Sequence, residues 1–90
     1  MPYELFYHPN IAKDIVRLPK NIKERIQRAI EDRLTTEPFH FGDPLRRSLQ
    51  GYRKLRIGDY RVIYKVDKDK VVILKIGHRK DVYTKFNIEE

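Results

Sequence analysis

Basic side chains lie on both sides of a Gly-Asp pair in the second half of the chain. Gly58-Asp59, between two runs of β-branched and aromatic residues, is typical of a two-residue hairpin turn. That turn would place Arg56 opposite Arg61, with Lys54 on the neighbouring diagonal of the same sheet face. Like charges opposite each other cost a few tenths to about 1 kcal/mol. The pattern therefore predicts either a preorganised cationic patch for phosphate groups or a solvated face whose long side chains spread into water.

Other catalytic groups are sparse. The chain has no Cys, which excludes disulfides, thiolate nucleophiles and Cys-containing zinc sites. Its three His residues are scattered without the spacing of metal ligands, so we expect no metal and no other cofactor. The helical carboxylates form no paired site and are interpreted as surface charge: Asp14, Glu24, Glu31 and Asp32.

The composition indicates one small, strongly basic domain spanning residues 1–90. Twenty Lys and Arg against thirteen Asp and Glu give a net charge of +7, which predicts attraction to polyanions, with nucleic acid first and an acidic protein second. The longest strictly apolar run is 71–74, far short of a membrane span, and no signal region precedes it. We therefore expect a soluble, cytoplasmic protein without a membrane partner.

Hydrophobic periodicity predicts the elements that must position the basic patch. Two helices with a break at Pro19 should follow a short aromatic strand, and a structured connection should lead into a three-stranded antiparallel meander. The β-α-α-β-β-β order predicts an α+β fold in which two N-terminal helices pack on one face of a small antiparallel sheet, followed by a short helix or a loose tail at 83–90. The ranges are 3–7 for the first strand, 11–18 and 19–36 for the helices, 38–51 for the connection, and 52–57, 60–66 and 71–76 for the meander.

Alternation assigns the two faces of the meander. One face should carry an apolar set against the helices: Leu55, Ile57, Tyr60, Val62 and Tyr64. The other face should carry Lys54, Arg56, Arg61 and Lys65. If Val66 pairs with Val71, however, Arg61 shares its face with apolar side chains of the last strand, so that face cannot be wholly solvated.

Two segments carry a family resemblance. Leu55–Tyr64 reads LRIGDYRVIY and Ile76–Tyr83 reads IGHRKDVY, and they follow a Leu18-Pro19 break between two helices and a connection ending in Leu49-Gln50-Gly51. In this order and spacing they resemble the RelE/ParE toxin superfamily of toxin-antitoxin modules. The resemblance covers nearly the whole chain.

The resemblance implies a type II toxin of the RelE branch. Such a toxin is a ribosome-dependent endoribonuclease, or mRNA interferase, that cleaves mRNA in the decoding site without a metal and so inhibits translation. The ribose 2′-hydroxyl attacks the adjacent phosphate and leaves a cyclic phosphate and a 5′-hydroxyl.

The resemblance also implies roles for individual residues. Lys54 and Arg61 match the phosphate contacts that stabilise the transition state, and Arg79 matches the arginine assigned to phosphate binding and leaving-group assistance. Tyr83 matches the tyrosine that orients or deprotonates the 2′-hydroxyl, with His78 as the other candidate proton acceptor. Tyr52 stands where RelE itself carries a further basic residue. Further RNA contacts are expected from basic residues near these positions: Arg46, Arg47, Arg53, Arg56 and His78.

Two alternatives remain open from the sequence. The first is a ParE-like toxin that inhibits DNA gyrase without enzymatic activity, and the second is an inactive RNA-binding homologue. Expected partners are a cognate antitoxin of acidic or amphipathic character, the mRNA, and the ribosome with its rRNA. Retention of Lys54, Arg61, Arg79 and Tyr83 together favours the nuclease.

Overall fold

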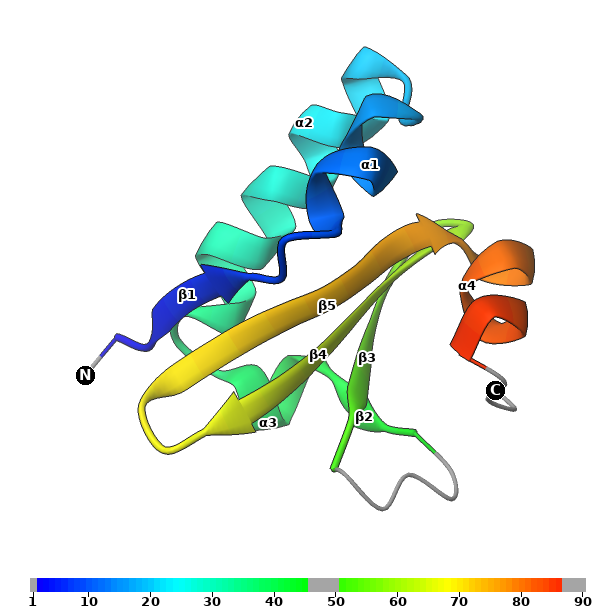
Figure 1. Cartoon of the computed structure of the whole chain (residues 1–90). Helices are drawn as coiled ribbons and strands as arrows, with labels where there is room; N and C mark the ends of the chain where they lie inside the picture. The colour runs from blue at the N-terminus through cyan, green and yellow to red at the C-terminus, as the bar shows by residue number, and fades with distance from the viewer. Residues whose placement is uncertain (1, 46–50, 87–90) are drawn as a thin grey trace.

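A mixed five-stranded sheet organises the chain (Figure 1). The computed structural model describes residues 2–45 and 51–86, with side chains up to Val82. The strand order is β1-β5-β4-β3-β2, for β1 (Glu4–Tyr7), β2 (Asp43–Pro44), β3 (Arg53–Ile57), β4 (Tyr60–Asp67) and β5 (Lys70–His78). The α+β class and the meander are confirmed, but the expectation of a purely antiparallel sheet is wrong because β1 pairs with β5 in parallel. The helices between these strands supply the long crossover that parallel pairing requires.

The helices begin and end where the sequence predicts a break. Pro19, with φ −58°, immediately precedes α2, and Pro38 occupies the first turn of α3. At the end of the second helix, the Thr35 and Thr36 hydroxyls donate to the Glu31 and Asp32 carbonyls, which satisfies carbonyl groups that have no helical partner. The bounds are α1 (Ile11–Val16), α2 (Lys20–Ala29), the π-helical turn η1 (Ile30–Leu34), α3 (Pro38–Phe41) and α4 (Arg79–Phe86).

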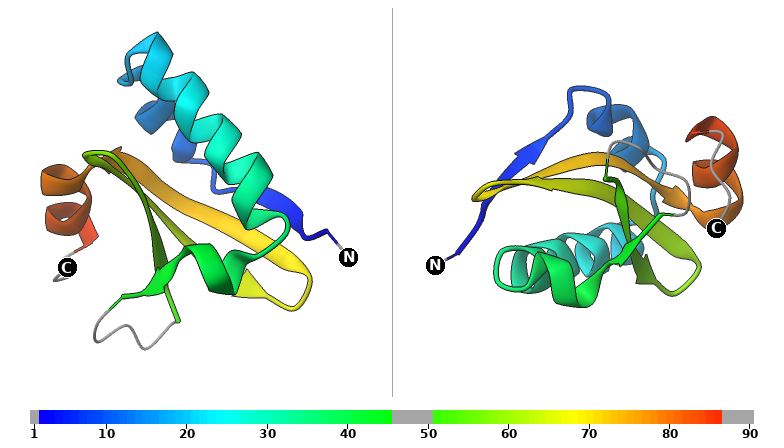
Figure 2. Two further views of the ribbon diagram at one scale, coloured as in Figure 1. Left: turned by 180° about the vertical axis from the view of Figure 1, so that it is seen from behind. Right: turned by 90° about the horizontal axis from the view of Figure 1, so that it is seen from below.

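The main core lies between the sheet and the first two helices. Figure 2 shows α2 running along the sheet while α4 lies beyond the end of β5. Leu55, Ile57, Val62 and Tyr64 all face this core, as the alternation predicts. Ile26 of α2 is 2% exposed within the same cluster. No helix within the described ranges is long and apolar enough to cross a membrane.

A second, smaller cluster lies on the opposite face of the sheet, where Val82 of α4 packs with Leu45 and Ile63. A register shift changes which residues of β5 reach it. Val66 pairs with Val71 as predicted, but the register changes between Ile63 and Tyr64. Leu74 packs against this second cluster, on the face of Arg61, as unshifted pairing also predicts. The shift instead moves Ile76, which pairs with Val62 and joins the main core, so Ile76 does not share the face of Arg61.

Asp14 is a structural carboxylate rather than the surface charge expected from the sequence. It is 6% exposed, one oxygen pairs with the Lys75 ammonium, and the other accepts a hydrogen bond from the Ile76 N–H at 3.2 Å. Strand β1 pairs with β5 only as far as Ile73. Beyond that point Asp14 supplies the acceptor that the strand edge needs, and it docks α1 against β5.

Candidate functional site

The β3–β4 hairpin has the register predicted from its turn. Arg56 lies opposite Arg61, and Lys54 lies opposite Ile63. Gly58 has φ +60°, the left-handed conformation that the first residue of a type II′ turn requires. Lys54 and Arg61 are therefore diagonal neighbours on one face, with Cα atoms about 7–8 Å apart. The face is the one that carries Ile63 and, above it, Val82 of α4.

Arg61 is not part of an open patch, which corrects the expectation of a solvated cationic face. Its side chain is 2% exposed, and Nη1 donates to the carbonyls of Gly58 and Tyr60, at 2.9 Å each. The reason is the position of β4 between two neighbouring strands, with α4 packed on its outer face through Val82. The guanidinium therefore holds the hairpin turn, while Arg56 on the neighbouring strand is exposed and Lys54 is half-buried.

Arg79 is anchored to the same turn. Its backbone N–H donates to the Asp59 carbonyl at 2.8 Å, and Nε lies 4.0 Å from Asp59 Oδ1. The side chain remains 48% exposed. Because Arg61 is bonded to Gly58 and Arg79 to Asp59, the two arginines meet at one two-residue turn, a convergence that strand register alone does not predict.

His78 lies at the end of β5, opposite Tyr60 on β4. The two rings meet edge to face with centroids 5.7 Å apart. Nδ1 of His78 accepts a hydrogen bond from the Lys80 N–H at 3.3 Å, so this nitrogen is occupied by the first turn of α4. A pocket of about 180 Å³ beside this pair is lined by Arg17, Asp81 and Tyr60, together with further residues of α1, β5 and α4.

The remaining predicted residues are only partly described. Tyr83 lies in α4, four residues after Arg79, and its side chain is outside the described part. Arg46 and Arg47 also lie outside the described residues. The roles predicted for these three residues stay predictions.

Arg53 has structural contacts that the sequence did not reveal. Its Nη2 donates to the Phe39 carbonyl at 3.0 Å and to the Gly42 carbonyl at 2.6 Å. On the neighbouring strand, the Tyr64 hydroxyl donates to the Pro38 carbonyl at 2.6 Å, and a Cβ at Gly42 would overlap that hydroxyl. Together these contacts fix α3 to the sheet, so Arg53 supports the fold whether or not it also contacts RNA.

Burial raises the pKa of two tyrosines, Tyr64 on β4 and Tyr7 on β1. It raises the pKa of Tyr64, although the Arg53 guanidinium acts in the opposite direction and Asp43 adds to the rise. Partial burial, followed by the charge of Glu31, also raises the pKa of Tyr7, although this residue is 44% exposed. Both phenols therefore remain protonated at neutral pH and serve as packing or hydrogen-bonding groups there.

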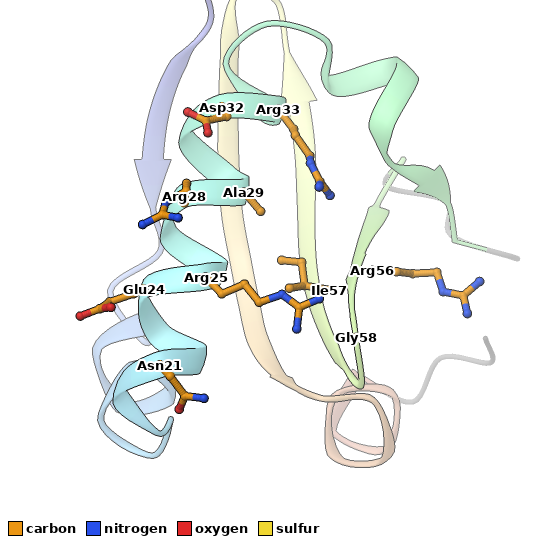
Figure 3. A pocket seen from close by; sticks show the side chains of 10 residues that line it. All are labelled: Asn21, Glu24, Arg25, Arg28, Ala29, Asp32, Arg33, Arg56, Ile57 and Gly58. Carbon is orange, nitrogen blue, oxygen red and sulfur yellow. The ribbon is translucent and has the colours of Figure 1, made fainter.

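Two cavities that sequence reasoning missed lie beside α2. One is an apolar pocket of about 510 Å³ between α1 and α2, lined by Ile11, Ile15, Leu18 and others. The other is a groove of about 340 Å³ between α2 and the end of β3 that contains several arginines (Figure 3). Within the described residues no three His, Asp or Glu side chains gather as metal ligands.

Comparison with known proteins gives a consistent result. A family described as "ParE toxin of type II toxin-antitoxin system, parDE" matches residues 5–83. The chain is 36% identical over 85 residues to Toxin RelG of Mycobacterium tuberculosis, covering 92% of this chain and 98% of that protein. It is 34% identical over 84 residues to Toxin RelE of the same organism, covering 91% of this chain and 87% of that protein.

The fold matches a solved complex. The toxin-antitoxin complex RelBE2 from Mycobacterium tuberculosis contains a chain that superposes with a TM-score of 0.81 at 35% sequence identity. The match covers 90% of this chain and 95% of that chain. The similarity thus extends over most of both chains.

Proposed function

Because the chain belongs to the RelE/ParE family of toxins from type II toxin-antitoxin systems, we propose that it is an endoribonuclease that cuts mRNA on the ribosome. The observation that carries this proposal is the attachment of Arg79 to the turn joining β3 and β4. That attachment brings an exposed guanidinium to the hairpin that holds Lys54 and Arg61. Such a group of fixed cations is suited to a phosphodiester, whose transition state gains negative charge.

The reaction needs no group beyond side chains and the RNA itself. The ribose 2′-oxygen forms a bond to the adjacent phosphorus while the bond from phosphorus to the 5′-oxygen breaks. A base takes the 2′ proton and an acid protonates the departing 5′-oxygen, which leaves a 2′,3′-cyclic phosphate and a 5′-hydroxyl. In this proposal Lys54 and Arg79 neutralise the non-bridging oxygens, Arg79 assists the leaving oxygen and Tyr83 accepts the proton.

For Arg61 to contact a phosphate of the message, α4 must change its position. The 2% exposure of Arg61 leaves it inaccessible to a phosphate while Val82 packs over Ile63 on the same face. The proposal therefore includes a movement of α4 away from β4 when the message binds. Until that movement occurs, Arg61 acts as a positioning residue for the Gly58-Asp59 turn.

The ribosome has a defined part in this mechanism. A phenol with an ordinary pKa of about 10 is a weak base at neutral pH, although nearby cations favour its ionised form. Alignment of the 2′-oxygen with the phosphorus and the leaving oxygen can supply much of the missing rate. Ribosome-bound message held in a bent geometry would provide this alignment, whereas free RNA would not.

A cognate antitoxin completes the proposal. The RelBE2 relative is a toxin-antitoxin complex, and a net charge of +7 favours an acidic partner. The apolar pocket between α1 and α2 suits the apolar side chains of an amphipathic segment. Binding of such a segment would silence the toxin.

The second candidate function is inhibition of DNA gyrase. It is favoured by the description of the matching family, which names the ParE toxin. In the resemblance, the gyrase-directed branch lacks the basic and tyrosine residues of the nuclease site. Lys54, Arg61, Arg79 and Tyr83 are all present here, so the nuclease is the better-supported proposal.

One experiment separates the two functions. The purified chain is added to ribosomes translating a defined mRNA, the 5′ ends are mapped, and a gyrase supercoiling reaction is run in parallel. We expect message fragments with 5′-hydroxyl ends and unchanged supercoiling. Lys54→Ala and Arg79→Ala should each slow cleavage by about 10²–10³-fold, which is the cost of removing one preorganised donor. The control variant Lys68→Ala, in the exposed β4–β5 turn, should cleave the message at the wild-type rate. Intact message with inhibited gyrase would overturn the proposal.

A further inference from the structure

A groove between α2 and the hairpin end of β3 carries an excess of positive charge. It has a volume of about 340 Å³ and is lined by four arginines, Arg25, Arg28, Arg33 and Arg56, together with Asn21, Glu24, Ala29, Asp32, Ile57 and Gly58. The lining thus contains four guanidinium groups and two carboxylates. The groove was not evident from the sequence, where these helical positions resemble an ordinary solvated face.

The charges are separated within the groove (Figure 3). Arg25 and Arg33 extend from the second helix toward the hairpin, whereas Arg28, Glu24 and Asp32 extend from the opposite side of the helix. Arg25 Nη1 lies 3.5 Å from the position that a Cβ would take at Gly58, so this guanidinium lies over the turn. The carboxylates therefore leave the side of the groove facing β3 cationic.

The arginines of the groove are not engaged by the fold. Across residues 2–45 and 51–82, no ion pair or side-chain hydrogen bond involves Arg25, Arg28 or Arg56. Arg33 lies 5.8 Å above the Phe41 ring, a contact that leaves its N–H donors available. The groove thus presents donors that a ligand can use.

The lining favours a phosphate backbone over a peptide. Ala29 and Ile57 are its only apolar side chains among the described residues, and both are buried in the main core. A bound peptide helix or strand needs apolar anchor pockets for specificity, and this groove has none. Arginine guanidinium groups match phosphate oxygens in a two-pronged geometry.

The groove also opens at an edge of the sheet. β2 pairs only with Arg53 and Lys54, so it does not cover β3 from Leu55 to Ile57. Arg56 extends from β3 on the side away from α2. Arg56 therefore belongs to the sheet face that carries Lys54 and Arg61, and a polyanion on the side of the groove that faces α2 meets Arg25 and Arg33.

We propose that the α2–β3 groove binds the phosphate backbone of ribosomal RNA, separately from the message that is cut. The groove lies on the helix-covered face of the sheet, whereas Lys54, Arg61 and α4 lie on the opposite face. The sheet thus separates an RNA segment bound here from the scissile phosphate. The inference rests on the proposed function, because it assigns this groove to holding the toxin on the ribosome.

The test measures binding of the isolated toxin to ribosomes that carry no message. The variant is Arg25→Gln with Arg33→Gln, since Gln and Arg have similar helix propensities. We expect about tenfold weaker binding to empty ribosomes, and the slope of log affinity against log salt should decrease by about 0.7–0.9 for each phosphate contact removed. In a cleavage assay the loss should appear in the half-saturating ribosome concentration rather than in the maximum rate.

A matched control removes the same charge elsewhere. Lys13→Gln with Lys68→Gln changes two exposed residues outside the groove and should retain both the affinity and the salt slope. Wild-type affinity in the Arg25 and Arg33 variant would overturn the inference, and so would a loss confined to antitoxin binding, which would make the groove a protein interface. A wild-type chain that binds empty ribosomes through this groove but leaves every message intact would contradict the proposed nuclease and not this inference.

Discussion

Replacement of Asp14 with alanine should destabilise the fold by about 3–5 kcal/mol, the cost of leaving a buried partner charge uncompensated. Lys75 is 16% exposed and would lose the carboxylate with which it pairs. The Ile76 N–H would also lose its acceptor, a loss of about 1–3 kcal/mol when a buried donor is left unsatisfied. Because one carboxylate satisfies both groups, the two costs overlap and we expect a total near the lower bound, about 3 kcal/mol.

Urea denaturation followed by far-ultraviolet circular dichroism measures this loss. The chain has no tryptophan, so backbone signals are the better probe. The double variant Asp14→Ala with Lys75→Met should recover much of the stability, because it removes the unpaired ammonium as well. A loss below about 1 kcal/mol for Asp14→Ala, typical of an exposed ion pair, would refute the buried role. If the effects of Asp14→Ala and Lys75→Met on the free energy of unfolding were strictly additive, that result would refute the coupling between the two side chains.

The remaining predictions concern the site, the core and the response to pH. With Ile63→Cys and Val82→Cys, an oxidised bridge should hold α4 on β4 and stop cleavage, and reduction should restore it, since the chain has no other cysteine. Cleavage by the oxidised variant at the wild-type rate would show that α4 does not need to move. Ile26→Ala should cost about 2–5 kcal/mol in the same urea assay because the side chain is 2% exposed in the core, and a loss under about 1 kcal/mol would place it outside the tight packing. Since burial raises the pKa of Tyr64 above its ordinary value of 10.0, the unfolded chain loses this proton first, so stability should decrease as pH rises through 10. Tyr64→Phe should make that decrease shallower, and an unchanged alkaline profile would contradict the assignment.

The hairpin shows what sequence can predict well. The turn glycine, which must adopt positive φ, determines the pairing of Arg56 with Arg61. The strict alternation of side chains on both strands determines which face of the sheet carries Leu55 and Val62. These are local properties of a short segment. They require no knowledge of how distant elements meet.

The features that sequence reasoning missed all depend on distant contacts. Alternation places Arg61 on a face but does not reveal that α4 covers it, and helical periodicity does not reveal that Asp14 lies against β5. The parallel pairing of β1 with β5 joins the two ends of the fold. In each case a residue far away in the sequence decides the role of the side chain, and the hydrophobic periodicity of a segment does not identify that residue.

The Gly58-Asp59 turn joins the two surfaces of this molecule. Arg25 lies over it from the groove side, while Arg61 and Arg79 hold its carbonyls from the side of the candidate cleavage site. The turn is therefore in contact with groups on both faces of the sheet. If RNA binds to both faces as proposed and the two sites are coupled through this turn, thermodynamic reciprocity requires that each RNA segment change the affinity for the other by the same factor.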